Sequence, residues 1–160
     1  MMKIVIYGVS RAGKNYLIEK MVNRLNAGGD KRAFHLEGST TLNSMAETNY
    51  GTTFKKASEE QKDILRKEFV QIVKKIEGDF EVVFVDGHYA FIAEDGYHVV
   101  FTEDDQNAYD TFFYLDTPPE MIVQFAKNSK GEKKILLLPR LISNIGNLLR
   151  KPILGLFVKA

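Results

Sequence analysis

The sequence predicts an α/β fold with a mainly parallel sheet and an inserted β-hairpin. Short apolar runs alternate with amphipathic helical patterns, and a glycine-containing loop joins the first run to the first helix. Strands that alternate with helices pair in parallel, because each helix returns the chain to the same edge of the sheet. The 160 residues, 44% hydrophobic and 27% charged, provide enough apolar material for the core of one domain.

The first element is a strand that leads into a loop and a helix. Residues 4–7 (IVIY) form a continuous apolar run, which is typical of a strand buried on both faces of a parallel sheet. After the loop, apolar residues recur at helical spacing from Leu17 to Leu25, and the glycine pair at 28–29 ends this helix.

A second strand and a long helix follow. Residues 32–37 (RAFHLE) predict a short strand, and the polar residues 38–56 predict a loop or a short irregular helix. A helix is expected from about 58 to 77, because Ser58 and Gln61 have the spacing of a capping box and apolar residues then form one face.

The remaining elements are two strands, the hairpin and one more helix. Residues 81–86 (EVVFVD) predict a third buried strand, and residues 89–102 predict a hairpin around the turn sequence EDG. Residues 111–117 (TFFYLDT) predict another strand, and the proline pair at 118–119 opens a helix. The aromatic residues of 80–114 are expected in the core, because they belong to strand runs.

The last part of the chain differs in charge from the rest. Residues 133–160 contain six Lys and Arg and no acidic residue, so residues 1–132 carry 16 basic and 21 acidic side chains. We therefore expect a core of residues 1–132 and a basic apolar tail of residues 133–160, either packed on the core or partly disordered.

The loop of residues 8–15 (GVSRAGKN) resembles a phosphate-binding loop except at its last position. In such a loop the backbone N–H groups and the following helix N-terminus face an anion, and the lysine adds a positive charge. The last position is normally Ser or Thr, whose hydroxyl binds Mg²⁺, whereas here it is asparagine. The expected nucleotide-binding residues are Gly8, Val9, Ser10, Arg11, Ala12, Gly13, Lys14 and Asn15.

Two carboxylates complete the candidate site. Asp86 ends the third strand, where it can hold Mg²⁺ with Asn15, although the sequence Asp-Gly also commonly starts a turn. Glu37 ends the second strand, where it can accept a proton from an attacking hydroxyl or cap the next segment. We expect Lys14, Asp86 and Glu37 to be catalytic, with His88 close to the same edge of the sheet.

At these motifs the chain resembles the P-loop nucleoside and nucleotide kinase-like family. The resemblance rests on GVSRAGKN, VVFVDG at 82–87 and FFYLDTPPEMIVQF at 112–125, and it covers about residues 1–130. It implies a three-layer P-loop NTPase fold with a five-stranded sheet of order 2-3-1-4-5. It also implies ATP and Mg²⁺ as cofactors, with Lys14 as the phosphate lysine. Relatives usually carry several arginines in a lid, whereas this chain has only Arg140 and Arg150 beyond the last predicted helix.

Three functions remain open at this stage. The first is an ATP-dependent phosphotransferase acting on a nucleoside, a nucleotide or another small acceptor. The second is a nucleotide-binding module with little or no transferase activity, which Asn15 and the few arginines favour. The third is a polynucleotide end kinase, for which only the basic tail would provide a binding groove.

Composition excludes other classes of protein. Without cysteine there are no disulfides or thiolate metal sites, and the three histidines have no metal-site spacing. The net charge of +1 gives no overall field for nucleic acid. We expect no signal peptide, no membrane span and a cytoplasmic location.

Overall fold

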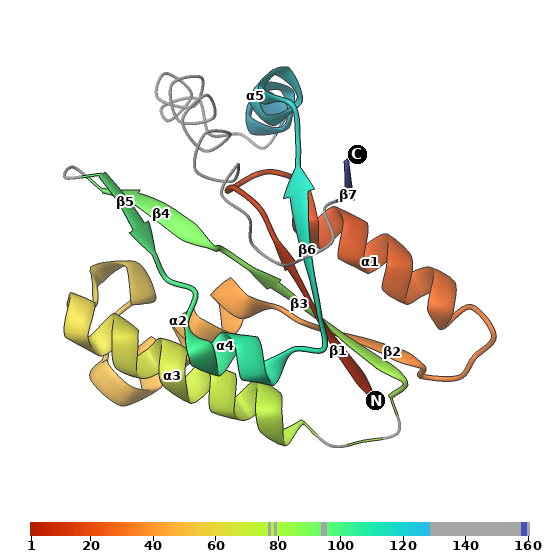
Figure 1. The fold of residues 1–160 in the computed structure, drawn as a ribbon, viewed down its shortest axis with the longest axis horizontal. Helices are drawn as coiled ribbons and strands as arrows, with labels where there is room; N and C mark the ends of the chain where they lie inside the picture. The colour runs from red at the N-terminus through yellow and green to blue at the C-terminus, as the bar shows by residue number, and fades with distance from the viewer. Residues whose placement is uncertain (77, 79, 94–95, 129–157, 160) are drawn as a thin grey trace.

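A computed structural model describes residues 1–76, 78, 80–93, 96–128 and 158–159 of the chain. Its central sheet has the strand order β2-β3-β1-β6-β7 (Figure 1). The strands are β1 (Met2–Tyr7), β2 (Ala33–Leu36), β3 (Val82–Gly87), β6 (Thr111–Asp116) and β7 (Val158–Lys159), and all neighbouring pairs are parallel. This arrangement confirms the expected five-stranded parallel sheet and its order.

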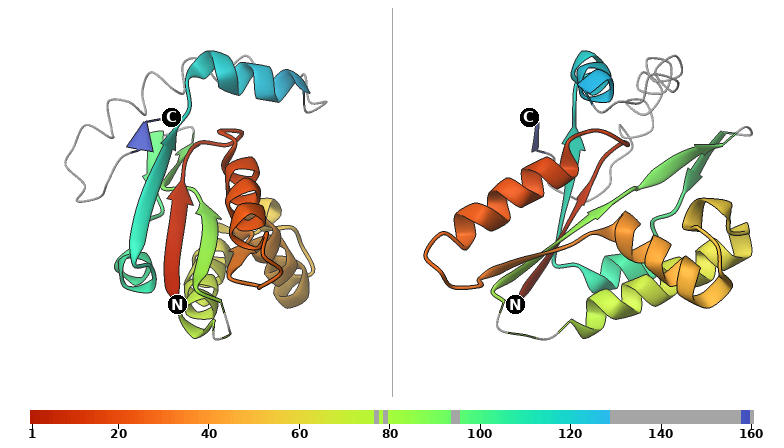
Figure 2. Two further views of the ribbon diagram at one scale, coloured as in Figure 1. Left: turned by 90° about the vertical axis from the view of Figure 1, so that its right-hand side faces the viewer. Right: turned by 180° about the vertical axis from the view of Figure 1, so that it is seen from behind.

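Helices cover both faces of this sheet, which makes three layers (Figures 1 and 2). Helix α1 (Lys14–Leu25) packs against one face, where Ile18 joins Ile6 and Phe84 in a buried cluster. Helices α3 (Glu59–Lys75) and α4 (Glu103–Ala108) pack against the other face, where Phe69 and Val73 join the odd-numbered residues of β1 and β3. Alternate residues of each strand therefore supply the two halves of the core.

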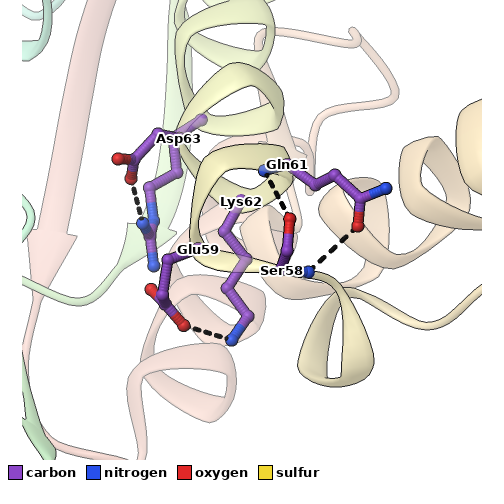
Figure 3. A network of polar contacts seen from close by, with 6 residues as sticks. Ser58, Glu59, Gln61, Lys62 and Asp63 are labelled. Atoms are coloured by element: carbon purple, nitrogen blue, oxygen red, sulfur yellow. Dashed lines mark hydrogen bonds and ion pairs between the residues drawn. The ribbon is translucent and has the colours of Figure 1, made fainter.

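The expected capping box is present at the start of α3. Ser58 accepts a hydrogen bond from the backbone N–H of Gln61, and the Gln61 side chain accepts one from the backbone N–H of Ser58 (Figure 3). Lys62 also pairs with Glu59 one turn away. These contacts satisfy N–H groups that a helix start leaves without intrahelical acceptors.

The segment of residues 38–56 is more regular than we expected. It forms α2 (Gly38–Tyr50), a full helix, followed by a short 3-10 helix η1 (Phe54–Lys56). The expectation of a loop or short irregular helix was wrong, because Ala46 and Gly38 are buried by packing that a weakly amphipathic sequence does not reveal. The turn at Gly51, with φ of 64°, ends the helix.

The hairpin lies outside the main sheet. Strands β4 (Ala90–Ala93) and β5 (Gly96–Val99) pair with each other in an antiparallel sheet of their own. Helix α4, which the sequence did not suggest, follows the hairpin and begins with a capping box between Thr102 and Asp105. Helix α5 (Pro119–Asn128) begins at the proline pair, as expected.

The basic tail lies outside the described residues, apart from β7, which pairs with the end of β6. The division into residues 1–132 and 133–160, and the contribution of Arg140 and Arg150, stay predictions.

Candidate functional site

The loop between β1 and α1 has the backbone geometry of an anion cradle. Arg11 and Gly13 adopt left-handed conformations, with φ of 66° and 90°, and Gly13 is the N-cap of α1. Gly8 permits a close approach to the end of β6, because a Cβ there would lie 3.0 Å from the carbonyl oxygen of Leu115, a tight contact. The first N–H groups of α1 have no intrahelical acceptor, so they are available to a phosphate group.

Lys14 is buried at the base of this loop. Its Nζ donates hydrogen bonds to the carbonyl oxygens of Gly8 at 2.9 Å and Val9 at 3.0 Å. Burial lowers the pKa of the Lys14 ammonium to about 8, although the negative charge of Asp86 opposes this shift. A phosphate group at the loop would therefore compensate a cation that the protein has already removed from water.

Asp86 lies at the carboxyl end of β3, opposite Ile6 of β1. Its Oδ1 accepts hydrogen bonds from the backbone N–H of Gly38 at 3.0 Å and from Nε2 of His35 at 3.1 Å. Burial alone would raise the pKa of this carboxyl group, but the bonds from His35 and Gly38 and the charge of Lys14 together hold the pKa below its ordinary value. Asp86 is thus a buried carboxylate that stays ionised.

The Asp-Gly pair does not form the turn that was the alternative to a functional role. Gly87 is the last residue of β3 and pairs with Tyr7 across the sheet. A Cβ at Gly87 would lie 2.9 Å from the Tyr7 ring, so the glycine permits close packing here.

The next residue, His88, also lies in the site. Burial and the charge of Lys14 lower the pKa of the His88 imidazole to about 4, which keeps it neutral.

Glu37 and Asn15, the other residues expected to take part in catalysis or metal binding, lie at the surface. Glu37 is the N-cap residue of α2, but its side chain is exposed and accepts a hydrogen bond from the Thr40 hydroxyl at 2.8 Å rather than from a backbone N–H. Asn15 is exposed on the first turn of α1. Their catalytic and metal-binding roles therefore stay predictions.

Two residues of the site were missed by the sequence analysis. His35 was considered only as a metal ligand, yet it contacts Asp86; its place as the next-to-last residue of the short strand β2 was the available signal. Thr117 donates a buried hydrogen bond of 2.7 Å to the carbonyl oxygen of Ala12, which ties the loop to the end of β6. No local pattern connects residues 105 positions apart.

The side chain of Arg11 indicates that an anion such as a nucleotide phosphate fits this loop. Its Nη1 is buried and has no hydrogen-bond partner in the part of the chain that the structure describes. A buried guanidinium nitrogen without an acceptor is costly, so this donor fits an anion bound at the loop. For a metal the described residues offer less: no three His, Cys, Asp or Glu side chains among them are grouped to hold an ion. Asn15 and Asp86 are the expected oxygen donors.

A cavity of about 210 Å³ adjoins Asp86 on the face covered by α3 and α4. Asp86, Gly87 and His88 form one side of it, and Gly38 and Ser39 of α2 lie beside them. Its other walls are mainly apolar: Val5, Leu42, Phe54, Phe69, Val70 and Phe101. Asp86 is therefore common to this cavity and to the electrostatic environment of Lys14, which suits a site where two molecules meet.

None of the helices in the described residues is long and apolar enough to cross a membrane. A search among curated proteins finds no match.

Solved structures of kinases share the fold. Shikimate kinase from Bacteroides thetaiotaomicron is 19% identical over 94% of this chain and 78% of that chain, with a TM-score of 0.57. Shikimate kinase from Acinetobacter baumannii, in complex with shikimate, is 17% identical over 100% of this chain and 83% of that chain, also with a TM-score of 0.57. The Pnkp1/Rnl/Hen1 RNA repair complex matches at 10% identity over 96% of this chain and 47% of that chain, with a TM-score of 0.59.

The family model described as AAA domain matches residues 7–135. That match spans more than half of the 160 residues and includes the loop, Asp86 and all the residues that line the cavity except Val5. The chain therefore belongs to the AAA domain family, and its fold is that of the P-loop kinases.

Proposed function

We propose that the chain is a phosphotransferase that moves the γ-phosphate of ATP to a hydroxyl or phosphate group of a small acceptor. The observation that carries this proposal is the position of Asp86. Its carboxylate interacts with the charge of Lys14 and also lines the 210 Å³ cavity. A phosphoryl donor at the loop and an acceptor in the cavity would then meet at one ionised carboxylate.

The loop supplies the groups that would hold the nucleotide. Backbone N–H groups of residues 9–14, the Lys14 ammonium and the buried Nη1 of Arg11 would bind its phosphate oxygens. Asn15 and Asp86 would provide oxygen atoms to its Mg²⁺. When bound, ATP with Mg²⁺ would supply the phosphoryl group, and ADP would be the leaving group.

Residues of the chain would activate the acceptor hydroxyl and stabilise the transferring phosphoryl group. Asp86 accepts the proton of the attacking hydroxyl, because its hydrogen bonds to His35 and Gly38 use Oδ1 and keep the group ionised. Lys14 stabilises negative charge that develops on the transferring group. Glu37 is the second candidate for the proton acceptor, and a variant at that position distinguishes the two.

A second function has one observation in its favour. Asn15 has no hydroxyl at the position where such loops bind Mg²⁺, and its side chain is exposed. A nucleotide-binding module without transfer would bind ATP equally well with and without Mg²⁺.

Calorimetric titration of ATP, with Mg²⁺ and with a chelator, tests the proposal together with an assay of acceptor-dependent ADP release. Lys14→Ala should lose ATP binding, and Asp86→Asn should keep binding but lose transfer. Lys31→Ala is the matched control, because this exposed lysine precedes the amino end of β2, whereas Asp86 lies near the carboxyl end of the parallel strand β3. Full transfer by Lys14→Ala would refute the proposal, and ATP binding that ignores Mg²⁺, with no transfer, would favour the binding module.

A further inference from the structure

The cavity beside Asp86 contains a second carboxylate, Asp105, which no motif suggested. Asp105 belongs to α4, the helix that follows the hairpin, and it lines the same cavity as Asp86. Its negative charge acts on the hydroxyl groups of Tyr7 and Tyr109, and the pKa values of both tyrosines are raised, mainly by burial. Asp105 therefore lies beside two neutral, buried phenols.

One carboxylate oxygen of Asp105 is available to accept a hydrogen bond from a ligand. Its Oδ2 accepts hydrogen bonds from the backbone N–H of Thr102 at 2.9 Å and from the Thr102 hydroxyl at 2.8 Å. Within the described residues Oδ1 has no donor. Asp105 lines a cavity with aromatic walls, and its helix cap uses only one of the two carboxylate oxygens, so the side chain can accept a hydrogen bond from a ligand in that cavity.

The cavity offers little positive charge to an anionic ligand. Among the described lining residues the one Lys or Arg side chain is Arg66, which forms an ion pair of 2.7 Å with Asp63 and stacks over the Phe54 ring. Its charge is therefore partly compensated before any ligand binds. The cavity as a whole favours a donor-bearing ligand over an anionic one.

We propose that this cavity takes a compact cyclic alcohol that carries an amino group, with Asp86 at the reacting hydroxyl and Asp105 binding the amino group. The apolar walls, including Leu42, Phe69 and Phe101, contact the ring. This inference rests on the proposed function for the role of Asp86, but binding of the amino group by Asp105 is independent of phosphoryl transfer.

A pair of matched probes tests the proposal without ATP. We would titrate trans-4-aminocyclohexanol and trans-4-hydroxycyclohexanecarboxylate into the protein and follow binding by ligand-detected NMR. The amine should bind at least about tenfold more tightly than the acid, as one charge-assisted hydrogen bond allows. Equal affinity, or tighter binding of the acid, would overturn the inference.

Two variants assign this preference to a side chain. Asp105→Asn should remove most of it. Glu103→Gln removes the same charge from an exposed position of α4 and should retain the preference. If Glu103→Gln loses it as fully as Asp105→Asn, the effect comes from the net charge, and the inference fails.

Magnetisation transfer from the bound amine to the rings of Tyr7 and Tyr109 provides a test that needs no variant. Binding without such transfer would place the amine elsewhere and overturn the inference. The enzyme assay separates the two proposals. Phosphorylation of the acid but not the amine would leave the proposed function standing and refute the acceptor class. Binding of the amine at Asp105 with no ATP-dependent transfer to any acceptor would support the amino-group site and refute the proposed phosphotransferase function.

Discussion

Replacing Lys14 with methionine should remove a specific pH dependence of the free energy of unfolding. Burial lowers the pKa of Lys14 from 10.5 to about 8 in the folded protein, although Asp86 opposes the shift. In the unfolded chain the pKa returns to its ordinary value, so the unfolded state binds more protons wherever the pH lies between the two values. The free energy of unfolding of the wild type must therefore rise with pH through this window.

The size of the effect follows from the two pKa values. Between about pH 7 and about pH 9.5, the wild type should gain on the order of 2 kcal/mol relative to Lys14→Met. Other groups that titrate in this range, including the buried tyrosines, contribute equally to both proteins and cancel in the comparison.

Urea unfolding at both pH values would measure this difference. The chain has seven Tyr and no Trp, so far-UV ellipticity is preferable to fluorescence, which tyrosine ionisation would change. Lys31→Met, at an exposed lysine, should behave as the wild type. Curves for wild type and Lys14→Met that change in parallel with pH would refute the reasoning. Saturating ATP should abolish the rise in the wild type, because phosphate charge beside Lys14 raises its pKa again.

Three further variants test the packing and chemistry of the site. Gly87→Ala should lower the free energy of unfolding by about 1 to 3 kcal/mol, because the new Cβ would lie 2.9 Å from the buried Tyr7 ring; thermal unfolding would measure it. Thr117→Val should cost about 1 kcal/mol in the same assay and weaken ATP binding, because it leaves the Ala12 carbonyl without its buried donor. Asn15→Ser should increase the Mg²⁺ dependence of ATP affinity by about tenfold in calorimetry, since it restores a metal-binding hydroxyl.

For each of these three variants, one result would contradict the prediction. Gly28→Ala, where nothing lies within 4 Å, should change stability by less than about 0.5 kcal/mol, and an equal loss at Gly87 and Gly28 would contradict the packing argument. Unchanged ATP affinity in Thr117→Val would show that the loop keeps its shape without that bond. Mg²⁺ dependence that stays the same in Asn15→Ser would mean that the metal does not contact this position.

Local patterns predicted most of the secondary structure, but for a physical reason they missed helix α4 and predicted only a loop or a short irregular helix where α2 lies. The glycine loop, the capping box at Ser58 and the proline pair are short-range signals, and each marks the element boundary that the structure has. Helix α2 and helix α4 have sequences with weak or short apolar patterns. They are helical because α3 and the sheet pack against them, and a sequence pattern does not contain that contact.

The sequence by itself determined the fold class, the strand order that the family resemblance implied, and the pairing of a phosphate loop with a carboxylate on a neighbouring strand. Those features depend on residues close together in the chain or on rules that hold for every parallel sheet. Only the tertiary structure decided that His35 and Gly38 hold Asp86, that Thr117 holds the loop, and that Asp105 faces the same cavity as Asp86. These contacts join segments far apart in the chain, so they exist only once the helices have packed on the sheet.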